Sequence, residues 1–512
     1  MITVSQEFQE ALENGDRNYL IKIDINPPNL MIVKPFTSKT VNGITITYNA
    51  DGSVILNGTA DENGCTINVM VNEITLAADR YRLSGYPDGC SAETYTMKLY
   101  TKWENTYYVW TGYNNDTVIN TTQRDNETVV AAQIVVQAGV TVSNLMFKPT
   151  LGKLSKILSF TKDNLISLSI EDAVSQDNKF TALGGAVINK ATITIDNSSE
   201  NYSTYDFKGA TVTIKIGLQI GNSPEYIDRG VYIVDNASPK GIGLELSCLD
   251  YMSKFDKSYT ESEIVYPATI KSIIDDACLK CGVIFTGTYL DSNYTLTTMP
   301  AVSTFRELLS AVGQITGTYA HVDRHGRLYF SWFNTTLLNQ AINSDTKVSG
   351  VYYIEDVLDN NYEKDNITVN GIRAYVINDE SNEKFEQHYP TTLTDNDFCL
   401  NITGSPLIHG GNITEIINRV GPRIVGLTIR QTKCKHTNNP LIEAGDVAMV
   451  LYSVKNNTNA YYPIAITRTT FAINQSQETV CGIETLSENL DGRYNDAQLL
   501  REQTKKDTND AK

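Results

Sequence analysis

The stretch from Tyr226 to Asp256 constrains the fold more than any other part of this chain. It contains two runs rich in β-branched and aromatic residues, Gly230–Val234 and Ile242–Leu249, on either side of the turn-forming segment Asn236–Gly241. Such runs on both sides of a turn segment predict a β-hairpin. Asp250 follows the second run directly and precedes a short segment with apolar spacing. Its carboxylate is therefore expected to cap a helical turn by accepting from free backbone amides.

The rest of the chain has the same bias towards strands. Tyr occurs 29 times, more often than Phe (14) and Trp (3) together, and tyrosine favours strands. At 512 residues the chain is too long for one core, and a size of about 150 residues per domain predicts three or four domains. The predicted class is mainly β with some α+β, as several β-barrel or sandwich domains.

The charge balance limits the partners. The formal net charge is -17 and the isoelectric point is near 4.8. This argues against DNA binding through neutralisation of phosphates. Two explanations of the acidity stay open: it keeps a large protein soluble, or it forms a wall that repels DNA passing along it. No targeting segment and no run of ~18 apolar residues is visible, so synthesis in the cytoplasm and no membrane span are expected.

A helix is predicted over 270–281, because its apolar residues recur at helical spacing and Gly282 follows. Cys278 and Cys281 lie on this apolar stripe, so they are assigned to the core and not to a metal or redox pair. The eight cysteines of the chain are scattered and do not indicate a disulfide framework.

A second helix is predicted after Thr304, with Glu307 completing a capping box. It leads to a hairpin that turns at Asp323–Gly326. The turn separates His321 from His325, so the two do not share a helix face as a metal pair would.

A third helix is predicted after Asn412, with Glu415 at the capping-box position. Strands are predicted at Val447–Val450 and Tyr462–Phe471. Glu443 and Asp446 lie in the tight entry to the first of these strands, so they are assigned to the turn and strand end and not to a catalytic carboxylate pair.

Residues 29–150 are predicted to be an inserted β-sandwich, because short strands recur there at even spacing. One predicted hairpin joins Val41–Tyr48 to Val54–Thr59 through Asp51 and Gly52, since glycine accepts the positive φ of a primed turn.

Three of these stretches together resemble phage baseplate hub and tail-associated proteins. The run Gly230–Val234 followed by Asp250, Met252 and Asp256 is similar to a pattern in the first hub domain. The segment Thr304–Leu328 resembles the helix, helix and hairpin unit of the second. The Pro440–Val447 segment resembles a feature near the C-terminus of hubs. Within the insert, Asn49–Ala60 resembles carbohydrate-binding-module-like domains of phages of Gram-positive bacteria.

The resemblance implies a domain order. Residues 1–28 and 151–258 form a first hub β domain split by the insert at 29–150. Residues 259–344 form an α+β hub domain with a helix-helix-hairpin unit, residues 345–490 form one or more C-terminal hub domains, and residues 491–512 form a polar tail or linker.

It also implies a function. The chain is expected to be a structural virion protein at the tail tip or baseplate, where a homotrimeric ring continues the tail tube and surrounds or closes the DNA exit path. The implied partners are the distal tail protein, the tail tube, the tape measure protein, optionally a tail fibre, host cell-wall polysaccharide through the insert, and DNA that passes without sequence-specific binding. Contractile and non-contractile particles, and the saccharide, are left open.

Sugar recognition in such modules relies on aromatic rings with polar neighbours. The candidate carbohydrate-binding residues lie within eleven positions: Trp103, Tyr107, Tyr108, Trp110 and Tyr113. On a strand, Tyr108 and Trp110 share one face and Tyr107 lies on the other. The alternative is that all five are ordinary core and loop aromatics.

No nucleophile elbow, HExxH motif, nucleotide-binding glycine pattern or paired Cys/His set occurs in the sequence. No catalytic residue, cofactor or metal is therefore predicted, and the chain is expected not to be an enzyme. The alternative function is a carbohydrate-binding surface adhesin or a carbohydrate-active enzyme. Two carboxylates about 5–9 Å apart in an aromatic cleft would favour the enzyme.

Overall fold

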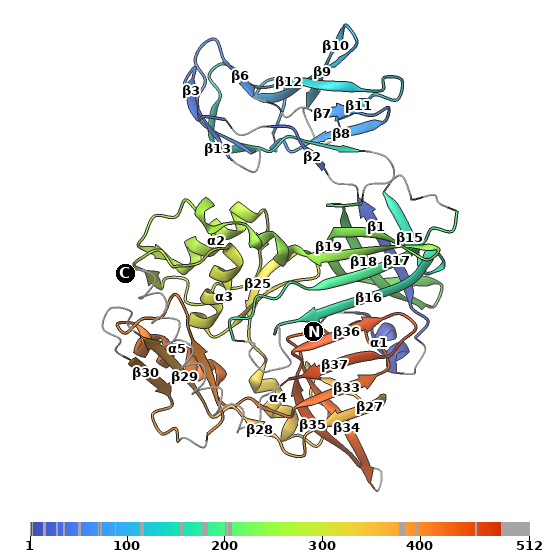
Figure 1. Cartoon of the computed structure of the whole chain (residues 1–512), viewed down its shortest axis with the longest axis vertical. Coiled ribbons are helices and arrows are strands. Elements are labelled where there is room, and N and C mark those ends of the chain that lie inside the picture. Colours follow the sequence, from blue (N-terminus) through green and yellow to red (C-terminus); the bar gives the residue numbers. More distant parts are fainter. Residues whose placement is uncertain are drawn as a thin grey trace. The chain divides into compact units, whose positions relative to one another are not determined.

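A computed structural model covers the chain, which is mainly β with a few helices, as predicted. The structure describes residues 2, 4–13, 17–26, 29–33, 36–49, 53–69, 71, 74–87, 89–112, 117–153, 157–175, 183–199, 202, 207–377, 384–394, 397–455 and 458–482. Two compact units emerge (Figure 1). The main unit contains Met1–Ile23, Phe160–Thr204 and Val212–Lys512, and the insert unit contains Asp24–Ser159 and Tyr205–Thr211.

An 11-stranded sheet runs through the main unit in the order β15-β1-β18-β19-β20-β17-β16-β36-β37-β33-β27. Its strands are β1 (Leu20–Asn26), β15 (Leu158–Thr161), β16 (Leu165–Ala173), β17 (Lys190–Asp196), β18 (Thr211–Ile220), β19 (Ser223–Lys240), β20 (Gly243–Asp250), β27 (Val357–Tyr362), β33 (Thr432–His436), β36 (Arg468–Ala472) and β37 (Gln477–Cys481). β16 pairs antiparallel with β36, with Ile170 opposite Phe471, so early and late parts of the chain share one sheet (Figure 1).

The predicted hairpin between Tyr226 and Asp256 is present, but its turn is misplaced in the prediction. Lys240 pairs with Gly243, so the turn is only Gly241 and Ile242, with Gly241 at φ +60°. The polar segment from Asn236 onward continues β19 as an exposed ribbon, because its backbone still pairs with β20. The predicted cap at Asp250 is confirmed: its side chain accepts from the Met252 amide at 3.0 Å and begins the 3-10 helix η2 (Tyr251–Asp256).

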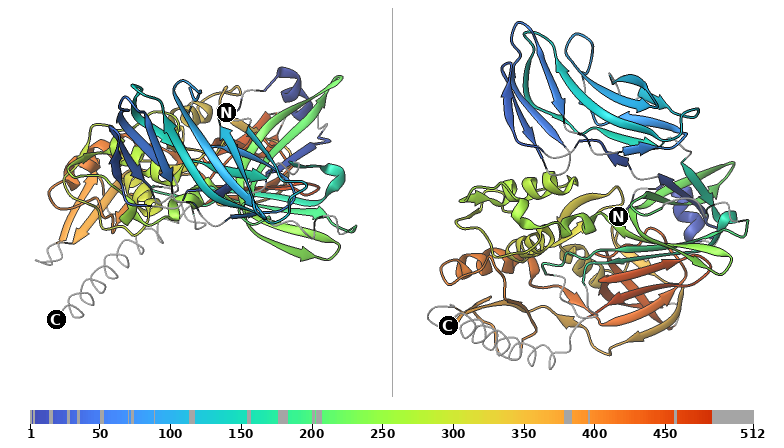
Figure 2. Two further views of the ribbon diagram at one scale, coloured as in Figure 1. Left: turned by 90° about the horizontal axis from the view of Figure 1, so that it is seen from above. Right: turned by 45° about the horizontal axis from the view of Figure 1, so that its top comes forward.

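The remaining helices and strands of the main unit lie beside this sheet. Its helices are α1 (Gln6–Glu13), α2 (Ile270–Cys281), α3 (Phe305–Thr316), α4 (Thr335–Ile342) and α5 (Ile413–Ile424), with short 3-10 turns η1 (Lys162–Asn164) and η3 (Tyr259–Glu261). The further strands are β21 (Ala268–Thr269), β22 (Ile284–Phe285), β23 (Thr295–Leu296), β24 (Tyr319–Val322), β25 (Arg327–Ser331), β26 (Tyr352–Ile354), β28 (Ile367–Thr368), β29 (Gly371–Ile377), β30 (Lys384–Tyr389), β31 (Cys399–Thr403), β32 (Thr428–Ile429), β34 (Val447–Lys455) and β35 (Thr458–Ala465). Within this unit, α2, α3 and α5 gather at one side and the long sheet lies at the other (Figures 1 and 2).

The predicted starts of the first two helices are confirmed, although the capping box expected at Thr304 is only half formed. Thr269 caps α2, and Gly282 ends that helix in the left-handed conformation. The Thr304 side chain accepts from the Glu307 amide at 3.2 Å, while the Glu307 carboxylate accepts from the Ser303 amide at 2.7 Å. In a capping box the Glu307 carboxylate would accept from the Thr304 amide; here it accepts from the amide of the preceding residue, Ser303.

The predicted cap at Asn412 is wrong, although α5 begins directly after it. The Asn412 side chain makes no cap hydrogen bond. Its Oδ1 instead accepts from the His409 amide at 2.8 Å, and its Nδ2 donates to the Leu407 carbonyl at 3.0 Å. The side chain therefore closes the preceding turn and is not available to the helix. The predicted strand Tyr462–Phe471 is also divided, into β35 and β36.

The predicted core position of the CxxC pair is confirmed. Cys278 and Cys281 are buried, and every cysteine is a free thiol. Burial raises the pKa of both thiols to about 12. Cys90 is the most accessible of the eight, and burial raises its pKa to about 11.

These thiols are expected to be protected in the folded protein. With Ellman's reagent at pH 8, roughly one thiol per chain at most should react rapidly, because reaction requires an accessible thiolate. Denaturation should expose all eight. Rapid native reaction of two or more thiols would contradict the burial of Cys278 and Cys281, and a Cys90→Ser variant identifies the reactive site.

The insert unit consists of strands over its described residues. They are β2 (Asn29–Met31), β3 (Lys39–Val41), β4 (Ile44–Tyr48), β5 (Val54–Thr59), β6 (Cys65–Val69), β7 (Ile74–Leu76), β8 (Arg80–Ser84), β9 (Tyr95–Trp103), β10 (Thr106–Gly112), β11 (Thr117–Asn120), β12 (Glu127–Val136), β13 (Thr141–Phe147) and β14 (Thr150–Lys153). They form the sheets β10-β9-β12-β6 with β7 beside β12, β11-β8-β14-β2, and β13-β5-β4-β3. Buried residues from all three sheets form one apolar cluster.

The first hairpins of the insert differ in part from the prediction. β4 and β5 pair as predicted, with Tyr48 opposite Val54, while Asp51 and Gly52 of their turn lie outside the described residues. The predicted single strand from Val41 to Tyr48 is wrong at its start. Asn42 and Gly43, both at positive φ, turn the chain so that β3 pairs with β4. Asn-Gly is the strongest short hairpin signal in a sequence, and it marks this turn.

Candidate functional sites

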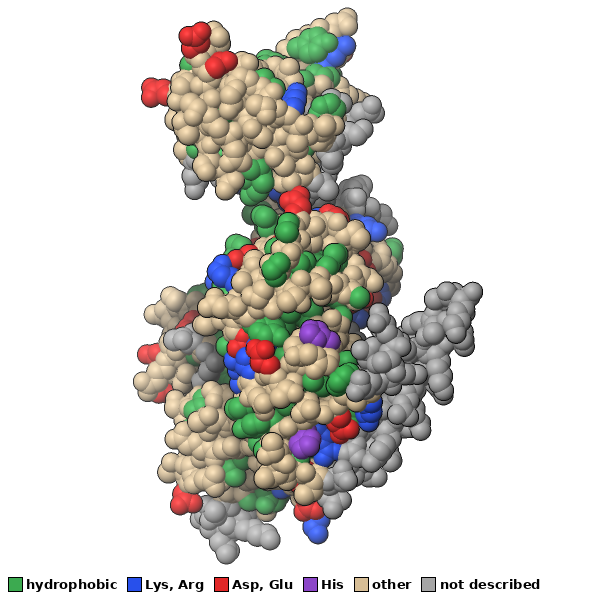
Figure 3. Space-filling view, turned by 90° about the vertical axis from the view of Figure 1, so that its left-hand side faces the viewer, with side chains coloured by type: hydrophobic (Ala, Val, Ile, Leu, Met, Phe, Trp, Pro, Cys, Tyr) green, Lys and Arg blue, Asp and Glu red, His purple; other side chains and the backbone are tan. Residues whose placement is uncertain are grey.

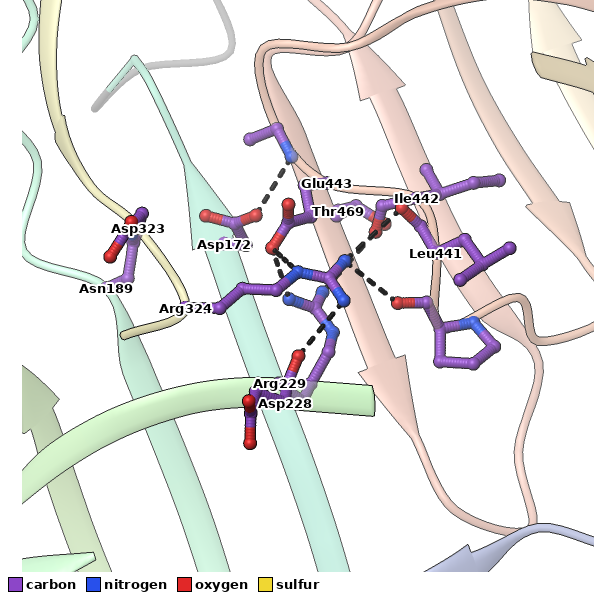
Figure 4. A network of polar contacts seen from close by, with 12 residues as sticks. Asp172, Asn189, Asp228, Arg229, Asp323, Arg324, Leu441, Ile442, Glu443 and Thr469 are labelled. Carbon is purple, nitrogen blue, oxygen red and sulfur yellow. Dashed lines mark hydrogen bonds and ion pairs between the residues drawn. The ribbon is translucent and has the colours of Figure 1, made fainter. Parts of the chain in front are cut away.

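Two arginines and one glutamate form the centre of a buried polar network in the main unit, here named the charged junction (Figure 4). Arg229 lies on β19, Arg324 in the turn between β24 and β25, and Glu443 in the loop before β34. Glu443 Oε1 lies 2.5 Å from Arg324 Nε and 3.2 Å from Arg229 Nη1. The Arg229 side chain is only 2% exposed, so its charge depends on this carboxylate for neutralisation.

Backbone carbonyls complete the coordination of the guanidinium groups. Arg324 donates to the carbonyl oxygens of Asp228 (3.0 Å), Pro440 (3.1 Å) and Leu441 (3.3 Å). Arg229 donates to that of Ile442 at 3.4 Å. A planar group with five N–H donors suits such a junction, because it can bind several segments at once. The charged junction therefore ties together segments that are far apart in the sequence.

A buried aspartate and histidine extend the junction. Asp172 Oδ1 lies 2.9 Å from His321 Nε2, and Asp172 Oδ2 accepts from the Ala444 amide at 2.9 Å. Burial opposes charge on both groups. His321, Arg229 and the amide more than offset that effect, so the pKa of Asp172 is lowered. The pKa of His321 is likewise raised, since Asp172 outweighs the effect of burial.

Two further carboxyl groups near the junction, those of Asp250 and Asp446, have raised pKa values. Burial raises the pKa of Asp250 to about 7, and its Oδ2 has no partner among the described residues. Burial also raises the pKa of Asp446, which accepts from the Glu443 amide at 2.9 Å, to about 7. The cavity between the junction residues is only about 20 Å³, room for roughly one water. The charged groups thus contact one another and leave little free volume between them, which fits a structural clamp.

The predicted positions of Glu443 and Asp446 in a turn are confirmed, and His321 and His325 do not share a helix face, as expected. Glu443 and Asp446 lie in the turn before β34, as predicted. His321 lies in the buried network, whereas His325 lies within the turn between β24 and β25, with Nδ1 3.6 Å from Asp228 Oδ2. Within the described ranges no group of three or more His, Cys, Asp and Glu side chains could hold a metal ion.

The candidate aromatic residues of the insert lie on and beside β10, an edge strand that pairs with β9. Tyr108 is opposite Thr101 and Trp110 is opposite Leu99. Thr101 and Leu99 are buried, so Tyr108 and Trp110 share the core side of the sheet. Tyr107, opposite Lys102, lies on the other side and is 63% exposed. The prediction that Tyr108 and Trp110 share a face and Tyr107 does not is confirmed.

The core-side pair is covered by an arginine. The rings of Tyr108 and Trp110 stack with centroids 6.5 Å apart, and the Arg124 guanidinium lies 4.2 Å from the Tyr108 centroid. Arg124 is held by Glu127, at 2.6 Å, and Trp110 Nε1 donates to Thr101 Oγ1 at 2.9 Å. This half of the candidate set is thus engaged within the insert unit itself.

The remaining candidates are placed separately. Trp103 ends β9, and its Nε1 donates to the Asp125 carbonyl at 3.1 Å. Tyr113 lies outside the described residues. The structure therefore brings Tyr108 and Trp110 together with Arg124, and leaves Tyr107 as the ring with the most exposed surface.

The charged junction contains the site residues that the sequence analysis missed, Arg229 and Arg324. Arg229 lies within Tyr226–Asp256 and Arg324 within Thr304–Leu328, but neither residue is singled out by those patterns, and each meets its partners only through the fold. On the molecular face drawn in Figure 3, acidic and basic side chains are dispersed. The described side chains form no continuous basic patch on that face. None of the described helices has the length and apolar character needed to span a bilayer.

The fold and sites define a β-rich multidomain protein with a structural charged junction and a separate β unit that bears exposed aromatic surface. No protein-family profile and no curated protein sequence matches the chain.

Several solved structures are similar to it. A 43 kDa tail protein of prophage MuSo2 from Shewanella oneidensis matches with 12% identity and a TM-score of 0.38, covering 65% of this chain and 97% of that one. The prophage tail protein gp18 from Listeria monocytogenes matches with 9% identity and a TM-score of 0.38, covering 67% and 96%. The c3393 protein of Escherichia coli, a type VI secretion component described as similar to tail proteins of phage T4, matches with 9% identity and a TM-score of 0.31, covering 63% and 74%.

Proposed function

We propose that this chain is a structural hub protein of a phage or phage-like tail tip. Three copies would form a ring that continues the tail tube and surrounds or closes the DNA exit path. The distal tail protein, the tail tube, the tape measure protein and optionally a tail fibre would contact this ring. DNA would pass without sequence-specific binding, past an acidic protein with a net charge of -17.

One observation carries the proposal: a single 11-stranded sheet includes strands from Leu20 to Cys481. Pairing of β16 with β36 and the contacts of Glu443 with Arg229 and Arg324 fix early, middle and late segments to each other. Such a scaffold suits a protein that transmits load and has no need to open for a substrate. The resemblance of Thr304–Leu328 and Pro440–Val447 to hub domains supports the same conclusion, with the hub domains bounded at 1–28 and 151–258, 259–344 and 345–490.

In this proposal the insert, residues 29–150, contacts host cell-wall carbohydrate and the chain has no catalytic role. The aromatic residues Trp103, Tyr107, Tyr108, Trp110 and Tyr113 remain the candidates for that contact, with exposed Tyr107 the best placed of the described four. The alternative is a carbohydrate-binding adhesin that acts without a tail. It predicts the same sugar binding but no ring.

Native mass measurement of the full chain, with averaged images of the same sample, tests the ring. The expected result is a species of three 56.8-kDa chains with threefold symmetry and a central opening. A monomer or dimer over the whole micromolar range would overturn the ring. Glycan binding by such a monomer would then favour the adhesin.

A further inference from the structure

The outer side of the β10-β9-β12-β6 sheet has a distinct composition. Side chains that alternate with the buried Leu99 and Thr101 on β9 are Lys98, Tyr100 and Lys102. On β10, Tyr107 and Val109 lie opposite Lys102 and Tyr100 and are 63% and 54% exposed. This set is named the lysine-tyrosine face. Because directly paired residues of an antiparallel sheet share one side, these residues form adjacent rows.

A chain of hydrogen bonds extends this face across the sheet. Tyr100 OH donates to Gln133 Oε1 at 2.7 Å, and Gln133 Nε2 donates to Asn68 Oδ1 at 2.7 Å. Asn68 lies opposite Gln133 on the exposed side of β6. These bonds fix the orientation of both amides. Because its oxygen accepts from Gln133, the Asn68 side chain has its amide nitrogen, a hydrogen-bond donor, at the end of this chain of bonds.

The charge of the face is unbalanced. Asp and Glu are absent from the strand positions of β6, β7, β9, β10 and β12 that face this side, and Lys98 and Lys102 form no ion pair with any described residue. The chain as a whole carries a net charge of -17. Two uncompensated lysines beside exposed tyrosine and valine therefore favour an anionic ligand that also has apolar surface.

The spacing of the lysines limits the ligand further. Four residues along a strand separate the Cα atoms of Lys98 and Lys102 by about 13 Å, so a ligand with several negative groups matches the pair better than one small anion does. A polymer with repeated negative groups can contact both. Lys102 Nζ lies over the Tyr107 ring, 5.5 Å from its centroid, so the other face of this 63% exposed ring is the one offered to the C–H surface of a sugar or polyol. The amides of Gln133 and Asn68 are placed for hydroxyls.

We propose that the lysine-tyrosine face binds an anionic cell-wall polysaccharide, with phosphodiester or carboxylate groups at Lys98 and Lys102. This rests on the proposed function, in which the insert contacts host carbohydrate, and names the ligand class and the face. The candidates Tyr108 and Trp110 then stabilise the edge strand from the core side, and Tyr107 contacts the ligand.

The test uses the full chain and calorimetric titration with poly(glycerol phosphate), polygalacturonate and neutral dextran at low salt. Binding of at least one charged polymer, weakened by salt, and no binding of dextran are expected. The Lys98→Gln/Lys102→Gln variant should bind roughly tenfold more weakly. Tyr107→Ala should also weaken binding, without the change in salt dependence that the lysine variant shows.

The matched control is Lys39→Gln/Lys153→Gln, which removes the same charge from β3 and β14 of the other sheets and should bind as the unaltered chain does. Binding of neither charged polymer, equal binding of dextran, or equal losses in the two double variants would overturn the proposal. Native mass of the same samples separates the two proposals. A trimer that binds no charged polymer refutes this face alone, and a monomer whose binding depends on Lys98 and Lys102 refutes the ring alone.

Discussion

Replacing Glu443 by alanine is expected to lower the free energy of unfolding of the main unit by about 3–5 kcal/mol. Glu443 Oε1 contacts both Arg324, at 2.5 Å, and Arg229, at 3.2 Å. The Arg229 side chain is 2% exposed, and without Glu443 the acidic groups left near its charge are Asp172 and Asp446, whose own pKa is raised to about 7. An unpaired buried charge costs more than the pair contributes, so the loss should exceed that of an ordinary surface ion pair.

Urea denaturation followed by circular dichroism measures this loss, and hydrogen exchange of peptides covering residues 439–446 assigns it to the junction. Glu415→Ala is the matched control, because Glu415 is 65% exposed and its contact with Arg419 is 3.4 Å long. That variant should lose less than about 0.5 kcal/mol. Glu443→Gln should lie between the two. A loss below about 1 kcal/mol in Glu443→Ala would show that the arginines do not depend on Glu443.

The second large effect is expected at Asp250 and depends on pH. Its folded-state pKa is raised to about 7 by burial, from an ordinary value of 3.8. A carboxyl with a raised folded pKa contributes its full stability below the unfolded pKa, and this contribution is lost as the pH rises through the folded pKa. The loss therefore falls between about pH 4 and pH 7, where the unfolded chain releases a proton that the folded chain retains.

Asp250→Asn should remove this loss. Asparagine keeps an oxygen for the Met252 amide and is as good a helix cap as aspartate, but it carries no charge. At pH 8 the variant is expected to be more stable than the unaltered chain by roughly 2–4 kcal/mol, and the difference should nearly vanish at pH 4.

Thermal or urea unfolding of both proteins at pH 4, 6 and 8 checks this. Asp235→Asn, a change of an exposed carboxyl on β19, serves as the control and should alter stability little at each pH. Destabilisation by Asp250→Asn at pH 8 would mean that the carboxylate is charged and stabilising in the folded protein, which contradicts the burial argument. The comparison between variants is needed because Asp172, with its lowered pKa, contributes in the opposite direction at acid pH.

The elements that the sequence predicted well are those fixed by contacts between near neighbours. The apolar stripe of α2, the cap of α3 by Thr304 and the cap of η2 by Asp250 each depend on residues within one or two turns. The alternation of Tyr107, Tyr108 and Trp110 is equally local, because successive side chains on a strand point to opposite sides.

The errors arose where a side chain or a turn had two local solutions. Asn412 is a residue type that commonly caps helices, but its side-chain oxygen accepts from the His409 amide instead. This bond forms because the preceding turn places that amide next to Asn412. Asn236 and Pro239 have the chemistry of a turn, yet pairing with β20 extends the strand to Lys240. In both cases two alternative sets of hydrogen bonds have similar strength. The spacing of residues in the sequence does not show which set forms.

Short-range periodicity and hydrophobicity were enough to predict the strand-rich class, the periodic faces of helices and strands, and the burial of Cys278 and Cys281. Two features instead depend on how distant segments pack: which side of the β9 and β10 pair faces solvent, and the meeting of Asp172, Arg229, Arg324 and Glu443. Those four residues come from separate strands and loops. Their contacts require the strands and loops of the sheet to be assembled. Ion pairs between segments that are distant in the sequence produce no periodic pattern from which they could be predicted.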